Sequence, residues 1–197
     1  MLAKAILLII ASEGYHPAEY GYTRKALEDA GIKVEIASDK MGVASGKPSA
    51  AHTAACKEAA CTKAAEDYPQ FAKVTVSKLV KDINPDDYDG LYIIGGPGAI
   101  EFLDNPTTYL ILQKWASRAK PMGAICISPR IFARAGLLEG KRVTGWDGDN
   151  KLAAILAEAK AHYIKEPAVV DGNLITANGP EAAIQFGQAI VSFFNVN

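Results

Sequence analysis

The sequence has no excess of charge of either sign and no long hydrophobic run. It contains 21 lysine and arginine residues against 22 aspartate and glutamate residues, a formal net charge of −1. Because no block of basic residues is present, we expect neither nucleic acid nor an anionic lipid surface as a partner. The longest apolar run covers residues 5–11, far short of the ~20 residues that span a bilayer. We therefore expect no membrane segment.

Cysteine and histidine are scarce, at three residues each. The odd number of cysteines and the poor match of the N-terminal run to a signal peptide argue against a disulfide framework. This favours the cytoplasm as the location. No GxGxxG motif follows the first apolar run, and no P-loop occurs in the chain, so we expect no cofactor.

What is present is an alternation of strand-like and helix-like segments over 197 residues, a length that suits one domain with a sizeable core. Apolar or alternating runs predict strands, and apolar residues at helical spacing predict helices. The predicted strands are residues 3–12, 33–38, 87–99 with a closing glycine turn, 121–126, 141–145 and 168–177; the predicted helices are 18–31, 107–119, 128–138 and 180–194. This order predicts a three-layer α/β sandwich with helices on both faces of a mostly parallel sheet.

Two segments depart from the parallel alternation. Asp171 and Gly172 join two β-rich runs, which predicts a C-terminal β-hairpin. Residues 49–72 are rich in alanine and interrupt the strand–helix rhythm. We interpret them as a surface excursion from a single domain of residues 1–197.

The excursion contains a weak metal-binding pattern. His52 and Cys56 are four residues apart and would share one helix face, which is compatible with two metal ligands. Cys61 falls off that face, and no second pair of ligands follows nearby. We therefore favour ordinary packing of small side chains and expect no metal.

The third cysteine, Cys126, stands where a predicted strand ends and a predicted helix begins. Ligands of open α/β sheets bind beyond the carboxyl ends of the strands, and a helix N-terminus lowers the pKa of a thiol. The N–H of Ile127 would point to the same place, and the glycine turn at 93–98 would supply a second oxyanion donor through Gly96. The alternative is a buried, inert cysteine, and these residues alone leave both interpretations open.

Four motifs resemble the ThiJ/PfpI superfamily, which has the flavodoxin-like fold of class I glutamine amidotransferases. The first is "AICISPRIFARAGLLEGKRVT" around Cys126, and the others cover residues 18–38, 83–99 and 169–191. They occur in the family's order and cover nearly the whole chain. The resemblance implies that Cys126 is a reactive cysteine on a nucleophile elbow. It also implies a homodimer or a higher homo-oligomer.

The resemblance also implies a second catalytic residue. The family keeps a glutamate in the helix after the first strand, hydrogen-bonded to the cysteine, and that position is Glu19 in this sequence. Otherwise Glu19 would be an ordinary helix-favouring carboxylate. Beside a thiolate it should retain its proton, because two negative charges in one site disfavour each other. It could then act as a general acid.

The family's usual histidines are absent. The protease-like branch has histidine directly after the cysteine, where this chain has Ile127, and another branch has one at the end of the next strand, where this chain has Gly145 and Trp146. The place of His16 near Glu19 makes it one candidate substitute, but we favour a solvated loop histidine. Without an imidazole, peptide hydrolysis should be slow, because the leaving amine lacks a good acid.

The resemblance therefore points to two functions. The first is a cysteine-dependent hydrolase or lyase that acts on a small electrophilic molecule, within a class commonly named intracellular protease or amidase. The second is a redox-sensing or stress-response protein that uses the same cysteine without catalysis. For the pocket around the cysteine we predict Gly95, Trp146 and His16 as further candidates, and Trp146 could equally pack in a dimer interface.

Overall fold

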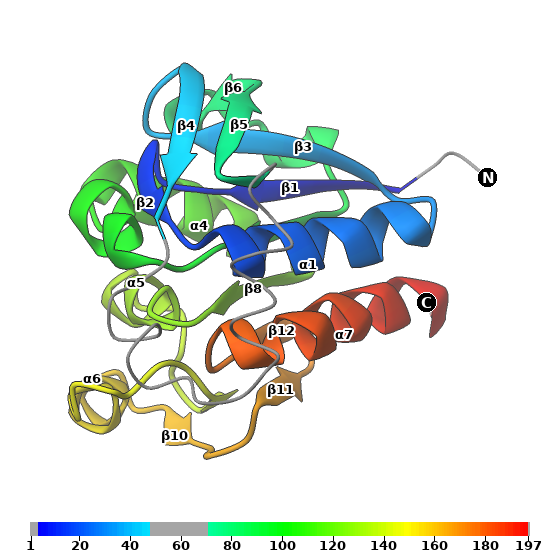
Figure 1. The fold of residues 1–197 in the computed structure, drawn as a ribbon. Coiled ribbons are helices and arrows are strands. Elements are labelled where there is room, and N and C mark those ends of the chain that lie inside the picture. Colours follow the sequence, from blue (N-terminus) through cyan, green and yellow to red (C-terminus); the bar gives the residue numbers. More distant parts are fainter. Residues whose placement is uncertain (1–3, 48–70, 197) are drawn as a thin grey trace.

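A seven-stranded sheet forms the centre of the molecule (Figure 1). The computed structural model describes residues 4–47 and 71–196. The sheet has the strand order β11-β12-β8-β7-β1-β3-β6, and within it β11 pairs antiparallel to β12 while the other pairs are parallel. Its strands are β1 Ala5–Ile9, β3 Lys33–Ser38, β6 Lys78–Leu79, β7 Gly90–Ile93, β8 Met122–Ile125, β11 Ala168–Asp171 and β12 Leu174–Ala177. The predicted mostly parallel α/β fold is confirmed.

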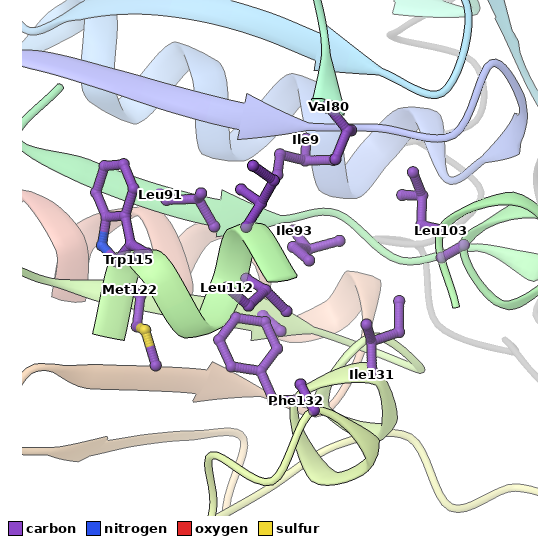
Figure 2. Packing of buried hydrophobic residues seen from close by; sticks show 14 of the residues in the cluster. Ile9, Val80, Leu91, Ile93, Leu103, Leu112, Trp115, Met122, Ile131 and Phe132 are labelled. Atoms are coloured by element: carbon purple, nitrogen blue, oxygen red, sulfur yellow. The ribbon is translucent and has the colours of Figure 1, made fainter. Parts of the chain in front are cut away.

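Helices cover both faces of this sheet, because its inner strands are apolar on both sides. Alternate residues of β1 separate the two cores: Ile6 and Leu8 pack in the cluster with α1 and α7, whereas Leu7 and Ile9 pack in the cluster with α4 and α5. Figure 2 shows the second cluster, where the sheet meets α4 and α5. The helices are α1 Pro17–Asp29, α4 Pro106–Ala116, α5 Pro129–Arg134, α6 Leu152–Glu158 and α7 Ala183–Val196.

Smaller elements lie outside the central sheet. A three-stranded sheet has the order β2-β4-β5, and β9 pairs with β10. The strand expected at 141–145 is thus confined to β9, which pairs beside the central sheet instead of within it. These elements are β2 Glu13–Tyr15, β4 Gly42–Gly46, β5 Lys73–Val76, β9 Arg142–Val143 and β10 His162–Tyr163, the 3-10 helices Val80–Asp82, Pro85–Asp87 and Pro180–Ala182, and the π-helical turn Ala99–Leu103.

Two predicted boundaries shift for reasons visible in the backbone. The hairpin is present, but β11 includes Asp171, and Gly172 with Asn173 makes the turn, Gly172 having φ 61°. The helix predicted at 128–138 ends four residues early, at Arg134. Gly136 then has φ 75°, a left-handed conformation that glycine adopts readily and that ends helices.

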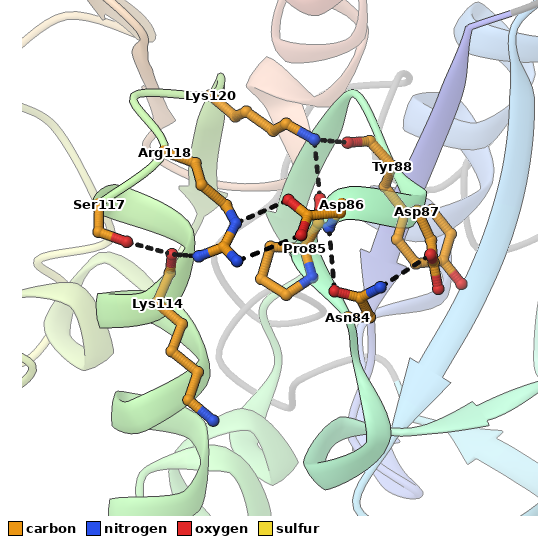
Figure 3. A network of polar contacts seen from close by, with 9 residues as sticks. All are labelled: Asn84, Pro85, Asp86, Asp87, Tyr88, Lys114, Ser117, Arg118 and Lys120. Carbon is orange, nitrogen blue, oxygen red and sulfur yellow. Dashed lines mark hydrogen bonds and ion pairs between the residues drawn. The ribbon is translucent and has the colours of Figure 1, made fainter.

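A polar network closes the end of the sheet where β7 and β8 begin (Figure 3). Arg118 donates from Nε and Nη2 to the carboxylate of Asp86 at 2.8 and 3.2 Å. Lys120 donates from Nζ to the carbonyls of Pro85 and Tyr88, each at 2.8 Å. These bonds tie the segment before β7 to the segment before β8, at the opposite end of the sheet from Cys126. They connect the two segments that lead into β7 and β8, the strands that end at the site.

The expectations for a membrane segment and for the excursion at residues 49–72 can be compared only with the residues that the structure describes. No helix in residues 4–47 and 71–196 combines the length and apolar character needed to cross a bilayer. Most of the predicted excursion, residues 49–72, lies outside the described residues, as do His52, Cys56 and Cys61.

Candidate active site

Cys126 occupies a strained turn between β8 and α5. Its φ is 64°, in the left-handed region where a residue with a side chain costs on the order of 1–3 kcal/mol. Two hydrogen bonds hold the residue there: its N–H donates to the carbonyl of Ala177 at 2.9 Å, and its carbonyl accepts from the N–H of Trp146 at 2.7 Å. The side chain is nearly buried, with 6% of the residue exposed. A turn is therefore present where the predicted strand meets the predicted helix.

Glu19 lies against the thiol. It sits in the first turn of α1, is fully buried, and its carboxyl group is hydrogen-bonded to the Cys126 side chain. The N–H of Gly95 donates to Glu19 Oε2 at 2.9 Å. The first helix therefore contributes a carboxyl group that the end of β7 holds in place, next to the sulfur.

The glycine turn after β7 provides the second side of the site. The backbone N–H groups of Gly96 and Ile127 both donate toward the Cys126 sulfur. A Cβ at Gly95 would lie 2.5 Å from the Cys126 Cβ and 2.7 Å from Glu19 Oε2, so no larger residue fits there. Gly96 has φ 107° and would place a Cβ 2.4 Å from the carbonyl oxygen of Gly14. The site thus requires both glycines, and the two predicted backbone donors converge on one atom.

The electrostatics of the thiol differ from the sequence-based expectation. Burial and the charge and hydrogen bond of Glu19 raise the pKa of the Cys126 thiol well above its ordinary value, while the N–H groups of Gly96 and Ile127 oppose this shift. The prediction of a lowered thiol pKa is therefore wrong. It relied on the dipole of a long helix, and α5 has only six residues. The sulfur also lies in a low-dielectric site beside a carboxylate.

His16 lies next to this site but is not the solvated loop histidine that the sequence favoured. It is 5% exposed and immediately precedes α1. Its backbone N–H donates to the carbonyl of Gly95 at 2.9 Å. His16 thus joins the start of the Glu19 helix to the glycine turn through its main chain.

Comparison with known proteins gives the family. The model of the DJ-1/PfpI family matches residues 4–193. The chain belongs to the DJ-1/PfpI family.

Related proteins of this family span most of the chain. An uncharacterized protein of Methanocaldococcus jannaschii is 31% identical over 193 residues, 98% of this chain and 83% of that protein. The deglycase PfpI of Pyrococcus furiosus is 26% identical over 88% of this chain and 90% of its own. A crystal structure of a ThiJ/PfpI domain protein from Brachyspira murdochii has a TM-score of 0.82 at 24% identity, covering 99% of this chain and 98% of that one. This last likeness bears on the fold alone.

Trp146, at the place where the family resemblance implies a histidine in one branch, packs against Arg130. The half-buried Trp146 ring lies under the Arg130 guanidinium, 5.5 Å from ring centroid to Cζ. Arg130, on α5, also donates to the Trp146 carbonyl at 3.1 Å and to both carboxylate oxygens of Asp149 at 2.9 and 2.6 Å. Sequence reasoning missed Arg130 and Asp149. The sequence feature that could have identified Arg130 is its position one helical turn after Cys126, on a helix face that should be buried.

A groove of about 630 Å³ opens beside Trp146. Asp147, Tyr163, Lys165 and Asn178 contribute polar groups to its lining. Of the predicted pocket residues, Trp146 lines this groove, whereas Gly95 and His16 lie on the Glu19 side of the cysteine. In the part of the chain that the structure describes, no group of three or more histidine, cysteine or acidic residues is arranged to hold a metal ion.

Proposed function

We propose that this DJ-1/PfpI family member is a cysteine-dependent hydrolase or lyase that acts on a small electrophilic substrate. The observation that supports this most directly is the convergence of the Glu19 carboxyl and the N–H groups of Gly96 and Ile127 on the Cys126 sulfur. A nucleophile, a proton acceptor and two oxyanion donors are the minimum for addition to a carbonyl carbon. The names of several archaeal relatives, called deglycases, agree with chemistry at a carbonyl adduct.

The raised thiol pKa reverses the proton placement expected from the sequence, in which Glu19 holds the proton: in this proposal the thiol holds it and Glu19 is the acceptor. In the resting enzyme the thiol retains its proton. As the sulfur attacks the electrophilic carbon, a new S–C bond forms, the thiol proton moves to the Glu19 carboxylate, and the carbonyl π electrons move to oxygen. The developing oxyanion accepts from the N–H groups of Gly96 and Ile127. For an ester-like substrate, the oxyanion re-forms the carbonyl as the bond to the leaving group breaks, and Glu19 gives its proton to that group. Water then adds to the thioester carbon, the C–S bond breaks, and the acid product leaves while the sulfur regains a proton.

Peptide hydrolysis fits this site poorly. A peptide nitrogen leaves only when it is protonated, and the family's two usual imidazole positions hold Ile127 and Trp146 here. Ile127 packs against both hydrophobic clusters and provides no proton donor from its side chain. The redox-sensing alternative is also less favoured. A sensor needs a standing thiolate, whereas an enzyme with an adjacent carboxylate needs one only while substrate is bound.

The test is turnover of a panel of small aldehydes, dicarbonyls and activated esters by the wild type and three variants. Cys126→Ser should abolish turnover, and Glu19→Gln should lower kcat by on the order of 10²-fold, the contribution of one positioned acid–base group. Cys61→Ser is the control and should keep full activity. Turnover that survives in Cys126→Ser would contradict the proposal. Selective oxidation of Cys126 by peroxide in a protein that turns over no compound of the panel would instead support the sensor.

A further inference from the structure

The most deeply buried charge near the cysteine that the mechanism does not use belongs to Arg130. The residue is 4% exposed, and the carboxylate with which it pairs is 30% exposed. A buried guanidinium is costly unless it is paired and hydrogen-bonded. Arg130 meets most of this requirement with a bidentate bond to Asp149, a bond to the Trp146 carbonyl and a position over the Trp146 ring, while its buried Nε has no hydrogen-bond partner in the described part of the chain. All of these contacts fix the segment that holds Trp146.

Trp146 in turn supports the strained cysteine. Its N–H donates to the Cys126 carbonyl at 2.7 Å, one of the two backbone bonds that hold Cys126 at φ 64°. Directly before it, a Cβ at Gly145 would lie 3.1 Å from the same carbonyl oxygen, so the two segments are in close contact. A left-handed residue other than glycine persists only where its surroundings over-determine it. The contacts of Trp146 are part of that support.

We propose that Arg130 is a positioning residue for Cys126. Through Trp146 it holds the cysteine turn in the conformation that aims the sulfur at Glu19 and at the N–H groups of Gly96 and Ile127. Planarity is essential to this role, because a guanidinium can bond bidentately and stack at the same time, whereas an ammonium group cannot. The catalytic consequence rests on the proposed function; the effect on the turn does not.

A matched control lies on the same helix. Arg134, one turn after Arg130, also forms an ion pair with an aspartate, Asp104, but it is 41% exposed and does not contact Trp146. Arg130→Lys and Arg134→Lys therefore make the same chemical change in one element. Asp149→Asn is a second test variant, which keeps the guanidinium and removes its carboxylate partner, in case Arg130→Lys fails to fold.

Two readouts separate positioning from simple stabilisation. The first is the iodoacetamide labelling rate of Cys126 against pH, with kcat and KM for any substrate found. Arg130→Lys should lower kcat by about 10- to 100-fold, the scale of a small misplacement of reacting groups, with KM less affected. Labelling should move to lower pH, because burial and Glu19, which a displaced sulfur would partly escape, are the main causes of the raised thiol pKa. The second is native-state amide exchange by NMR. The N–H groups of Trp146 and Cys126 should exchange about tenfold faster, while the N–H of Ile94, bonded to Ile9 in the central sheet, should not.

The outcomes distinguish this inference from the proposed function. Labelling profiles and local exchange of Arg130→Lys that overlay those of Arg134→Lys would overturn the positioning role, even if both variants lose stability. If Arg130→Lys exchanges faster at Trp146 and Cys126 while the wild type turns over no compound of the panel, the positioning of the turn is supported and the proposed function fails. Uniformly faster exchange, including Ile94, would show that Arg130 only stabilises the fold, and this result would also count against the inference.

Discussion

At the scale of single residues, the thiol and the carboxyl group of the site cannot be treated separately. Cys126 and Glu19 share a buried environment and a hydrogen bond, so they titrate as a pair. The N–H groups of Gly96 and Ile127 favour the thiolate, but burial and an ionised Glu19 outweigh them, and the pKa of the thiol is raised. Binding of substrate must then drive transfer of the proton from the Cys126 thiol to Glu19.

This balance gives a directional prediction for Glu19→Gln. The amide keeps the shape of the side chain and removes the charge that raises the thiol pKa, so the pKa of Cys126 should fall relative to the wild type. Turnover should nevertheless fall, because the proton acceptor is gone. The measurement is the iodoacetamide labelling rate against pH, with mass spectrometry to assign the modified cysteine. A thiol pKa that rises in Glu19→Gln would show that Glu19 acts chiefly as a donor to the thiolate.

Single residues also show what the sequence could and could not predict about the site. Cys126, Gly96 and Ile127 were found because they lie where predicted strands end, and Glu19 was found through the family resemblance; the structure brings all four together. The direction of the thiol pKa was not predictable, since it depends on burial on all sides. Arg130 was missed for the same reason, because its burial depends on the loop between β9 and α6, which is distant from it in the sequence.

At the scale of elements, the connection between β9 and α6 holds the cysteine turn in place through the hydrogen bond from Trp146 to Cys126. Asp149 in this connection has a pKa lowered to about 2, and the largest cause is its hydrogen bonds from Arg130. A carboxylate whose folded pKa is depressed stabilises the fold above its unfolded pKa of ~3.9, and loses that contribution as pH falls toward its folded value. The stabilisation from the Asp149–Arg130 ion pair is therefore lost in acid.

Asp149→Asn should lower the free energy of unfolding at pH 7 by on the order of 2 kcal/mol, because it leaves Arg130 buried without a carboxylate. The difference from the wild type should shrink as pH falls below about 4, where the wild-type carboxylate begins to lose its advantage. Urea denaturation at pH 7, 5 and 3 measures this. A gap of constant size across that range would mean that the ion pair is not its cause.

Element boundaries mark where sequence reasoning fails in the rest of the fold. The parallel strands were predicted well because each is an apolar run buried on two faces, as in β1 and β7. The small sheet of β2, β4 and β5 was not predicted, since its strands have mixed burial and little apolar periodicity. The early end of α5 follows from the φ of Gly136, which a helical pattern alone does not reveal.

At the scale of the whole molecule, the packing of two cores leaves many phenol groups in low-dielectric surroundings. Burial raises the pKa of six tyrosines, that of Tyr109 to about 12, and the same holds for the Cys126 thiol. The tyrosines are Tyr15, Tyr20, Tyr88, Tyr92, Tyr109 and Tyr163. They belong to both faces of the sheet and to the small elements around it, so their protonation states report on the entire fold.

The chain should therefore lose stability steeply in alkaline solution. A group whose folded pKa is raised holds its proton more tightly in the native state, so stability is full below its unfolded pKa and falls as pH rises above it. With unfolded tyrosines titrating near ~10, the free energy of unfolding should decline from about pH 9 upward, with several protons released on unfolding. Urea denaturation between pH 8 and 11, followed by tyrosine ionisation in the ultraviolet, measures both quantities.

Tyr92→Phe provides the matched variant for this prediction. Tyr92 is fully buried on β7, its hydroxyl has no hydrogen-bond partner within the described part of the chain, and burial raises its pKa. Removing the hydroxyl should be neutral or slightly stabilising at pH 7, because an unpaired buried polar group costs about 1–3 kcal/mol. It should also reduce by about one the protons released on alkaline unfolding, since one raised phenol is gone. Tyrosines that ionise fully in the still-folded wild type at pH 10 would contradict the burial on which this argument depends.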